Sequence, residues 1–336
     1  MGSLTQLLHT ARDGLTAQSY GLNVTGQNIA NVNTPGYVRR EAQLETRALG
    51  TQTTGTVHAA GLRRVTDAFL ERREYESQGL MSAAKEHDQR LESVEALFND
   101  ITGSGLGSSL DAVFQSFSRL AANPSDPTVR LSVLDAAEGF SQRVRDTGNA
   151  LAQTRDNLLK DAQAVVNQVN ENAQAISRLN RQISIAEAQG NDAADLKDQR
   201  DDLILGLAGL IDVRTINSDG SIAIQASGIT LVEGEEARQL SVDLASDGSM
   251  RLLAERAGGG SPTEITRFLT GGKLAGIREA RDVDVFAVAQ RLDEFVFDVS
   301  TAINAQHAQG FGLDGGTLRD VFDVGPTVTG AARALR

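Results

Sequence analysis

Histidines are the first residues to examine for chemistry, because an imidazole can bind a metal or move a proton near neutral pH. The chain has four histidines in 336 residues, and they are widely scattered: His9, His58, His87 and His307. Metal sites with a local signature place their ligands a few residues apart, as in His-Glu-x-x-His. No histidine here has an acid or another histidine at metal-ligand spacing, so we expect structural or surface roles for all four.

Other candidate sites also have ordinary explanations. The triple glycine at 258–260 lacks the strand-to-helix context of a phosphate-binding loop, so a flexible loop is expected. Asn23-Val24-Thr25 matches a glycosylation acceptor but falls within a predicted helix. Glu279, Asp282 and Asp284 lie near a predicted helix start, where the helix dipole favours acids. We therefore expect no catalytic residue, no metal and no cofactor, and hence no enzyme.

The composition of the chain excludes several classes of binding partner and site. The formal net charge is −12, which disfavours a general binder of nucleic acid or of acidic membranes. No cysteine is present, so disulfides and thiolate sites are excluded. The start of the chain carries no secretory signal pattern, and no apolar run reaches the length of a membrane span, so no membrane insertion is expected.

The N-terminal helix is the first element that could position a functional surface. Leu8, Leu15, Leu22 and Ile29 recur every seven residues within a predicted helix at 4–30. Such a narrow stripe is typical of a coiled-coil seam and requires a partner helix. An amphipathic helix packed on its own domain explains the pattern equally well.

A turn motif follows this helix. Pro35 stops the helix and pushes its predecessor toward extended backbone, while Gly36 permits positive φ. Asn31 and Asn33 can bond nearby backbone, and Tyr37 is expected to anchor the turn with its ring and hydroxyl. Together with Asn28 they form the candidate motif.

Periodicity predicts the rest of the fold as mainly α: an elongated helical bundle with a coiled-coil-like N-terminal helix and a small β-rich insertion. A long helix is expected from about residue 128 to 190, with one apolar row at Ala162, Val169, Ile176 and Ile183. Two Ser-Asp-Gly-Ser turns then predict hairpins that form a separate β unit. The expected parts are an axial helix and turn at 1–37, an extended connector at 38–66, a helical bundle at 67–212, a β-rich element at 213–270, a returning helix at 271–310 and a tail at 311–336.

Several segments resemble flagellar axial proteins, the family of rod, hook and hook-associated subunits. Asn28-Ile29-Ala30-Asn31-Val32-Asn33-Thr34-Pro35-Gly36-Tyr37 is similar to the signature shared across that family. The later segments resemble the hook-associated branch in particular. They are the interhelical turn at 123–130, the segment Gly271-Gly272-Lys273-Leu274-Ala275-Gly276-Ile277-Arg278-Glu279 and the helix end at 304–311.

This resemblance implies a structural role at the junction between hook and filament, outside the cell, after type III export. It implies as partners the hook protein, the third hook-associated protein, copies of the same chain in a ring or helical layer, and an export chaperone. It also implies a second heptad helix near the C-terminus, which the tail at 311–336 does not show, so the chain is expected to be truncated or unusual. The alternatives are a distal rod or hook subunit, which would turn β-rich soon after Tyr37, and an enzyme carried on an axial scaffold.

Overall fold

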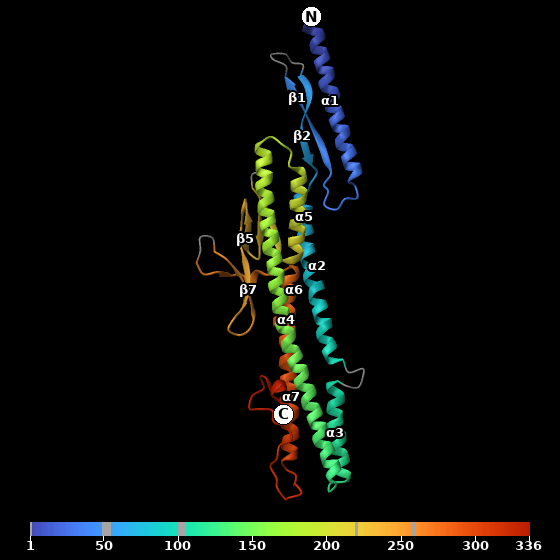
Figure 1. Ribbon diagram of the computed structural model, residues 1–336, viewed down its shortest axis with the longest axis vertical. Coiled ribbons are helices and arrows are strands. Elements are labelled where there is room, and N and C mark those ends of the chain that lie inside the picture. The colour runs from blue at the N-terminus through green and yellow to red at the C-terminus, as the bar shows by residue number, and fades with distance from the viewer. Residues whose placement is uncertain (1, 49–54, 100–104, 219–220, 257–259) are drawn as a thin grey trace. The chain divides into compact units, whose positions relative to one another are not determined.

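The computed structural model describes residues 2–48, 55–99, 105–218, 221–256 and 260–336. The predicted mainly helical fold with small antiparallel sheets is confirmed (Figure 1). Contacts divide the chain into two units, which are described separately. The first comprises Met1–Ser82, Val166–Ser241 and Leu252–Gly272, and the second comprises Ala83–Val165, Val242–Arg251 and Lys273–Arg336.

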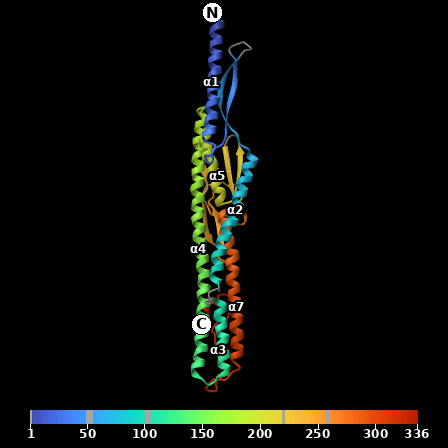
Figure 2. The same ribbon diagram turned by 90° about the vertical axis from the view of Figure 1, so that its right-hand side faces the viewer.

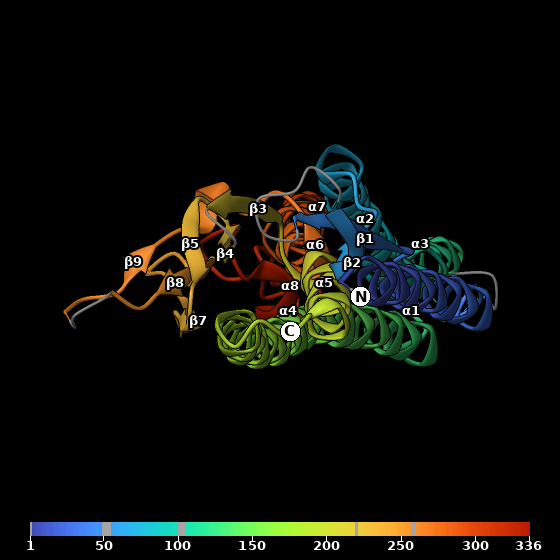
Figure 3. The same ribbon diagram turned by 90° about the horizontal axis from the view of Figure 1, so that it is seen from above.

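The first unit begins with helix α1 (Gly2–Ala30) and the hairpin of β1 (Arg40–Ala48) and β2 (Gly55–Arg64). The two strands pair antiparallel from Arg40↔Arg64 to Ala48↔Gly55, with one irregularity between Gln43 and Leu44. The hairpin lies alongside α1, as Figures 1 and 3 show. Within the segment 38–66, which was expected to be an extended connector, residues 40–48 and 55–64 are therefore extended and pair with each other.

Two helices follow the hairpin. Helix α2 (Ala68–Glu95) starts after Asp67, whose carboxylate accepts a bond from the Phe69 amide at 2.9 Å, and a short 3-10 turn (Ala96–Phe98) continues it. Helix α3 (Leu106–Ala122) ends at a turn in which Asp126 accepts a bond from the Thr128 amide at 2.8 Å. This contact makes Asp126 the N-terminal cap of the next helix.

The long helix α4 (Pro127–Ala188) has 62 residues. Its predicted apolar row at Ala162, Val169, Ile176 and Ile183 is buried. In the second unit α4 lies beside α3 and the returning helix α7, as Figures 1 and 2 show, and it buries Phe140, Val144 and Leu151 there. Apolar residues recur on one face along most turns of α4, so the helix packs against other elements along most of its length.

Helix α5 (Ala194–Leu210) leads into two sheets. One has the order β3-β4-β5-β6 (Val213–Ser218, Ser221–Ala226, Ile229–Glu233, Glu236–Ala237), and its first three strands lie side by side in Figure 3. The other has the order β7-β8-β9 (Leu240–Leu244, Met250–Ala254, Thr263–Glu264).

The β-rich element is not a separate unit, in contrast to the expectation from its turns. Residues up to Ser241 group with the part of α4 from Val166 onward and with α5. Asn170 of α4 accepts a bond from the Leu240 amide and donates one to the Leu240 carbonyl, both at 2.8 Å. Asn180 of α4 donates to the Gly234 carbonyl at 2.9 Å. Polar side chains of α4 thus hold the backbone of this element.

The returning helix begins at Gly272, ahead of the helix start that was expected near Asp282. It consists of α6 (Gly272–Glu279), a π-helical turn (Ala280–Asp284) and α7 (Val285–His307). Asp282 and Asp284 therefore lie within a continuous helical path, so the predicted dipole explanation for them is wrong. Asp282 instead accepts a bond from the Met250 amide at 2.8 Å and pairs with Arg281.

The tail at 311–336 shows no periodic pattern, yet it folds onto the second unit. Asn304 of α7 donates to the Phe322 carbonyl at 2.7 Å, and the Phe322 ring packs edge-on against Phe140 at 5.8 Å between centroids. Asp293 accepts bonds from the Gly330 and Ala332 amides at 2.7 and 2.9 Å, at the start of a short helix, α8 (Ala331–Ala334). Among the helices that the structure describes, none is long and apolar enough to cross a membrane.

Candidate functional site

The heptad row of α1 is exposed. Leu8, Leu15, Leu22 and Ile29 expose 64%, 71%, 72% and 70% of their surface. Among the side chains of α1 that the structure describes, Ala17 and Val24 are buried, and they lie on another face, toward the hairpin. The helix thus packs on its own domain through one face and leaves a row of large apolar side chains uncovered. Such a surface is typical of an association site.

Asn28 joins the end of α1 to the start of β1. Its carbonyl oxygen accepts bonds from the Tyr37 hydroxyl and the Arg40 amide, both at 3.0 Å, and its amide donates to the Arg40 carbonyl at 2.8 Å. The predicted hydroxyl contact of Tyr37 is therefore present. Asparagine fits this position because it offers a donor and an acceptor on one short side chain.

The remaining motif residues shape the turn itself. Asn31 accepts a bond from the Thr34 hydroxyl at 3.2 Å and so stabilises the backbone turn after α1. Gly36 has a φ of 77°, which a side chain would strain, as expected from the sequence. Asn33 and Pro35 are exposed at the outside of the turn. The role of these residues in assembly remains a prediction.

A cluster of charged residues next to the turn was not predicted. The Arg40 guanidinium, which also lies over the Tyr37 ring, contacts Asp195 at 2.6 Å and Asp198 at 2.7 Å. Arg64, the register partner of Arg40, lies 2.7 Å from Asp198 and 2.5 Å from Asp201. Both arginines come from the hairpin and all three carboxylates come from α5. We call these five residues, Arg40, Arg64, Asp195, Asp198 and Asp201, the ionic clasp.

Burial shapes the electrostatics around the clasp. Burial alone lowers the pKa of the Arg40 guanidinium, but its bonds to Asp198 and Asp195 outweigh this and raise the pKa above its usual value. Arg200 has a lowered pKa because it is buried. Burial, together with Asp201, raises the pKa of both Glu71 and Tyr75 on α2. A weak signal existed in the sequence, since Asp195, Asp198 and Asp201 recur at every third residue and so lie near one face of a helix.

One histidine has an acidic partner that spacing along the chain did not reveal. The His87 ring nitrogen Nε2 lies 2.8 Å from Asp284, which is 197 residues away in the sequence. His307 bonds the Arg319 carbonyl through Nδ1 at 2.7 Å. Within the described ranges, no group of three or more histidines and acids is arranged to hold a metal ion.

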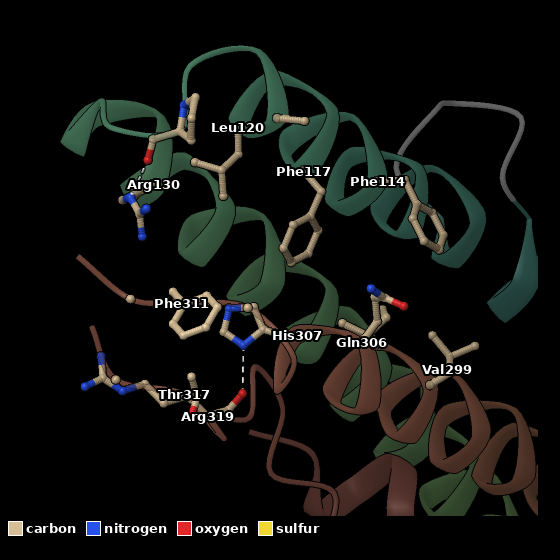
Figure 4. A pocket seen from close by; sticks show the side chains of 17 residues that line it. Phe114, Phe117, Leu120, Arg130, Val299, Gln306, His307, Phe311, Thr317 and Arg319 are labelled. Atoms are coloured by element: carbon tan, nitrogen blue, oxygen red, sulfur yellow. Dashed lines mark hydrogen bonds between the residues drawn. The ribbon is translucent and has the colours of Figure 1, made fainter. Parts of the chain in front are cut away.

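The second unit has an apolar pocket of about 770 Å³ between α3, α7 and the loop that follows α7. Figure 4 shows Phe114 and Phe117 facing Val299, His307 and Phe311 across it. Both arginines of the lining already have partners, because Arg319 pairs with Asp314 and Arg130 Nε donates to the Pro124 carbonyl at 2.8 Å. The lining therefore offers packing rather than acid–base chemistry.

Comparisons with known proteins give a consistent assignment. A family model described as "Flagellar hook-associated protein FlgK helical domain" matches residues 91–322, and one described as "Flagella basal body rod protein" matches residues 8–37. Flagellar hook-associated protein 1 of Salmonella typhimurium is 30% identical over 335 residues, covering 97% of this chain and 60% of that protein. The protein of the same name from Escherichia coli is 28% identical over 332 residues, covering 96% of this chain and 60% of that protein.

A solved structure supports the fold. The flagellar hook junction protein FlgK from Burkholderia pseudomallei superposes with a TM-score of 0.68 at 22% identity and covers 77% of this chain and 47% of that one. The chain thus spans about 60% of the length of the Salmonella and Escherichia relatives.

Proposed function

The chain belongs to the flagellar hook-associated protein FlgK family, and from this premise we propose that it is a structural subunit of the bacterial flagellum at the junction between hook and filament. The observation that carries the proposal is the match of the helical-domain model over residues 91–322. The rod-protein match over 8–37 adds an axial N-terminal helix to the same chain.

In this function the exposed row of α1 is the packing surface. Leu8, Leu15, Leu22 and Ile29 stand uncovered along one side of a 29-residue helix. Burying one large apolar side chain stabilises an interface by roughly 1.5–3 kcal/mol, so four of them in register provide a substantial seam. The occupant of this seam is a helix of the same or a neighbouring subunit.

The proposed partners are inferred from the position of the subunit along the axis of the flagellum. The hook protein lies on one side and the third hook-associated protein on the other, while further copies of the chain complete the layer in a ring or helix. An export chaperone holds the chain before secretion, and the assembled subunit is extracellular. The protein acts by packing and display and catalyses no reaction.

Deletion of the gene in its source bacterium tests this proposal. We expect hooks without attached filaments, filament protein free in the medium, and restoration by the intact gene. Immunogold labelling should mark only the hook–filament boundary. Labelling along the rod or the hook would favour another axial subunit. Replacement of a single surface Asp, Glu or His could abolish filament attachment while the variant still folds and is incorporated. That result would favour a catalytic role for the replaced residue.

A further inference from the structure

The N-terminal arm is internally cohesive. We define it as α1, the turn and strands β1 and β2, residues 2–48 and 55–64. Its strands pair along their full length, Asn28 bonds both backbone groups of Arg40, and Ala17 and Val24 are buried on the hairpin side of α1. Residues 65–67 connect the arm to α2. The arm can therefore move as one body if its lateral contacts with α5 give way.

Those lateral contacts include the ionic clasp. Arg40 exposes 7% of its side chain, Arg64 12% and Asp198 10%, so the central charges are nearly buried. A polar cleft of about 600 Å³ lies between the turn and α5. Its lining includes Gly36, Tyr37, Asp195 and Asp202. On this side the arm is held by charge pairs across a polar space rather than by an apolar interface.

The clasp is incompletely satisfied. Arg40 Nε, Arg64 Nε and Asp198 Oδ1 are buried and have no hydrogen-bond partner within the described part of the chain. Arg64 Nε lies 2.7 Å from Asp198 Oδ1, so the pair attracts electrostatically without the alignment of a hydrogen bond. Buried ion pairs with unmet hydrogen bonds recover only part of their desolvation cost, so the clasp depends on keeping all of its charges.

We propose that the ionic clasp is a latch that fixes the direction of the N-terminal arm on α5, and that the arm swings as a unit about residues 65–67 when the latch loses one of its charges. Removing Arg40 leaves Asp198 with Arg64 alone, and removing Asp198 leaves each arginine with one carboxylate. The remaining buried charges then have fewer partners, and opening relieves this cost by exposing them to water. The helices and the hairpin keep their own hydrogen bonds in both states. This inference concerns the isolated chain and does not depend on its place in the flagellum.

Distance measurement between two spin labels tests the latch. The chain has no cysteine, so Ser19→Cys on α1 and Ser184→Cys on α4, both at exposed positions in the first unit, can be labelled selectively. Electron–electron double resonance then reports the distance from arm to body. Dilution of labelled chains into unlabelled chains suppresses distances between molecules that associate through α1.

We expect one narrow distance distribution for the chain with an intact clasp. Arg40→Gln and Asp198→Asn should each broaden it or add a second peak, while circular dichroism shows unchanged helix content. Arg63→Gln is the matched control, because Arg63 pairs with Glu41 at 2.6 Å within the hairpin and its own side chain is 62% exposed. This control should leave the distribution unchanged.

Three results would overturn the latch. The first is a narrow, unshifted distribution in both clasp variants. The second is a distribution in the parent chain that is already as broad as in the variants. The third is cooperative unfolding of the chain by Arg40→Gln and Asp198→Asn, since the clasp would then be part of the core rather than a latch on it.

Discussion

The Tyr37 hydroxyl donates a hydrogen bond to Asn28 Oδ1 at 3.0 Å and so ties the end of α1 to the strand that follows. Tyr37→Phe removes this one bond and leaves the two backbone bonds of Asn28 in place. We expect a loss of about 1 kcal/mol in the stability of the arm. Asn28→Ala removes all three bonds, so a loss of about 2–3 kcal/mol is expected.

Hydrogen exchange at the amides of β1 measures both changes. Thr34→Ala provides a control, because its hydroxyl bonds only Asn31 on the exposed side of the turn. Equal effects of Tyr37→Phe and Asn28→Ala would show that the backbone bonds of Asn28 contribute nothing measurable.

The seam of α1 should affect association but not folding. Leu15→Ser alters a side chain that is 71% exposed, so the change in unfolding free energy should stay within about 0.5 kcal/mol. Val24→Ser is the contrasting variant, because Val24 is 5% exposed, and a loss of about 2 kcal/mol is expected for the arm. Sedimentation measures association and thermal unfolding measures folding. Unchanged association in Leu15→Ser would remove the case for the seam.

Hydrogen exchange should also vary along α1. Burial on the hairpin begins at Ala17, while the described side chains between Leu4 and Arg12 are all exposed. An isolated helix end frays because tertiary packing supplies most of its stability. In the dilute chain we expect fast exchange over 4–12 and slower exchange over 17–30. Uniformly slow exchange over 4–30 would show that the exposed row has a partner after all.

The periodicity of the sequence predicted those structural features that depend on residues close together in the chain. The row through Ile176 and Ile183 is buried as expected, because a repeated apolar position on a long helix needs a partner wherever it faces. Gly36 has positive φ because the turn after Pro35 requires it. The exposed row at Leu8 and Leu15 could not be assigned from its pattern alone, since a seam and an amphipathic face have the same period.

Contacts between remote segments could not be predicted in this way. Arg40 and Asp198 are 158 residues apart, and nothing in either segment specifies that they meet. The tail lacks periodicity, yet Phe322 is 2% exposed because Phe140 and the backbone bonds of Asn304 hold it. The sequence predicts a helix start near Asp282 because the apolar positions of α7 begin just after it, at Val285.

Gly272 is expected to tolerate no side chain. It has a φ of 76°, and a Cβ there would lie 2.2 Å from the Ile211 backbone nitrogen. Backbone cannot move aside cheaply, so Gly272→Ala should cost about 3 kcal/mol or more. Gly139→Ala is the matched control, since that glycine lies inside α4 with open space around it and should gain about 0.5–1 kcal/mol. Thermal unfolding distinguishes them, and equal midpoints for the two variants would contradict the packing argument.

Glu71 should make stability depend on pH. Burial, and then Asp201, raise its pKa, so the folded state binds the proton more tightly than the unfolded state. Its ionised form therefore destabilises the fold, and this penalty grows as pH rises from the unfolded pKa of about 4.3 to the raised folded pKa. Glu71→Gln should stabilise the chain at pH 7, and the gain should vanish at pH 3.5. A gain that is independent of pH would show that charge is not the cause.

The link between α4 and the β-rich element gives the last prediction. Asn170 makes two bonds of 2.8 Å with the backbone of Leu240, whose side chain is 3% exposed. Asn170→Ala leaves a buried amide and a buried carbonyl without these partners, and we expect a loss of about 2–3 kcal/mol. Asn157→Ala, on the same helix but in an exposed bond with Gln153, should change stability by less than about 0.5 kcal/mol.

Replacement of residues 213–270 by a short Gly/Ser linker should also cost stability, because α4 loses both the Leu240 and the Gly234 contacts. Urea unfolding followed by helix content measures this, and the loss should fall on the part of α4 from Val166 onward, which groups with the element. Hydrogen exchange shows which part of the chain loses stability. We expect faster exchange over 166–188 in the replacement variant than in the parent chain. If exchange there is unchanged after the replacement, the element is a separate unit and its contacts with α4 add no stability.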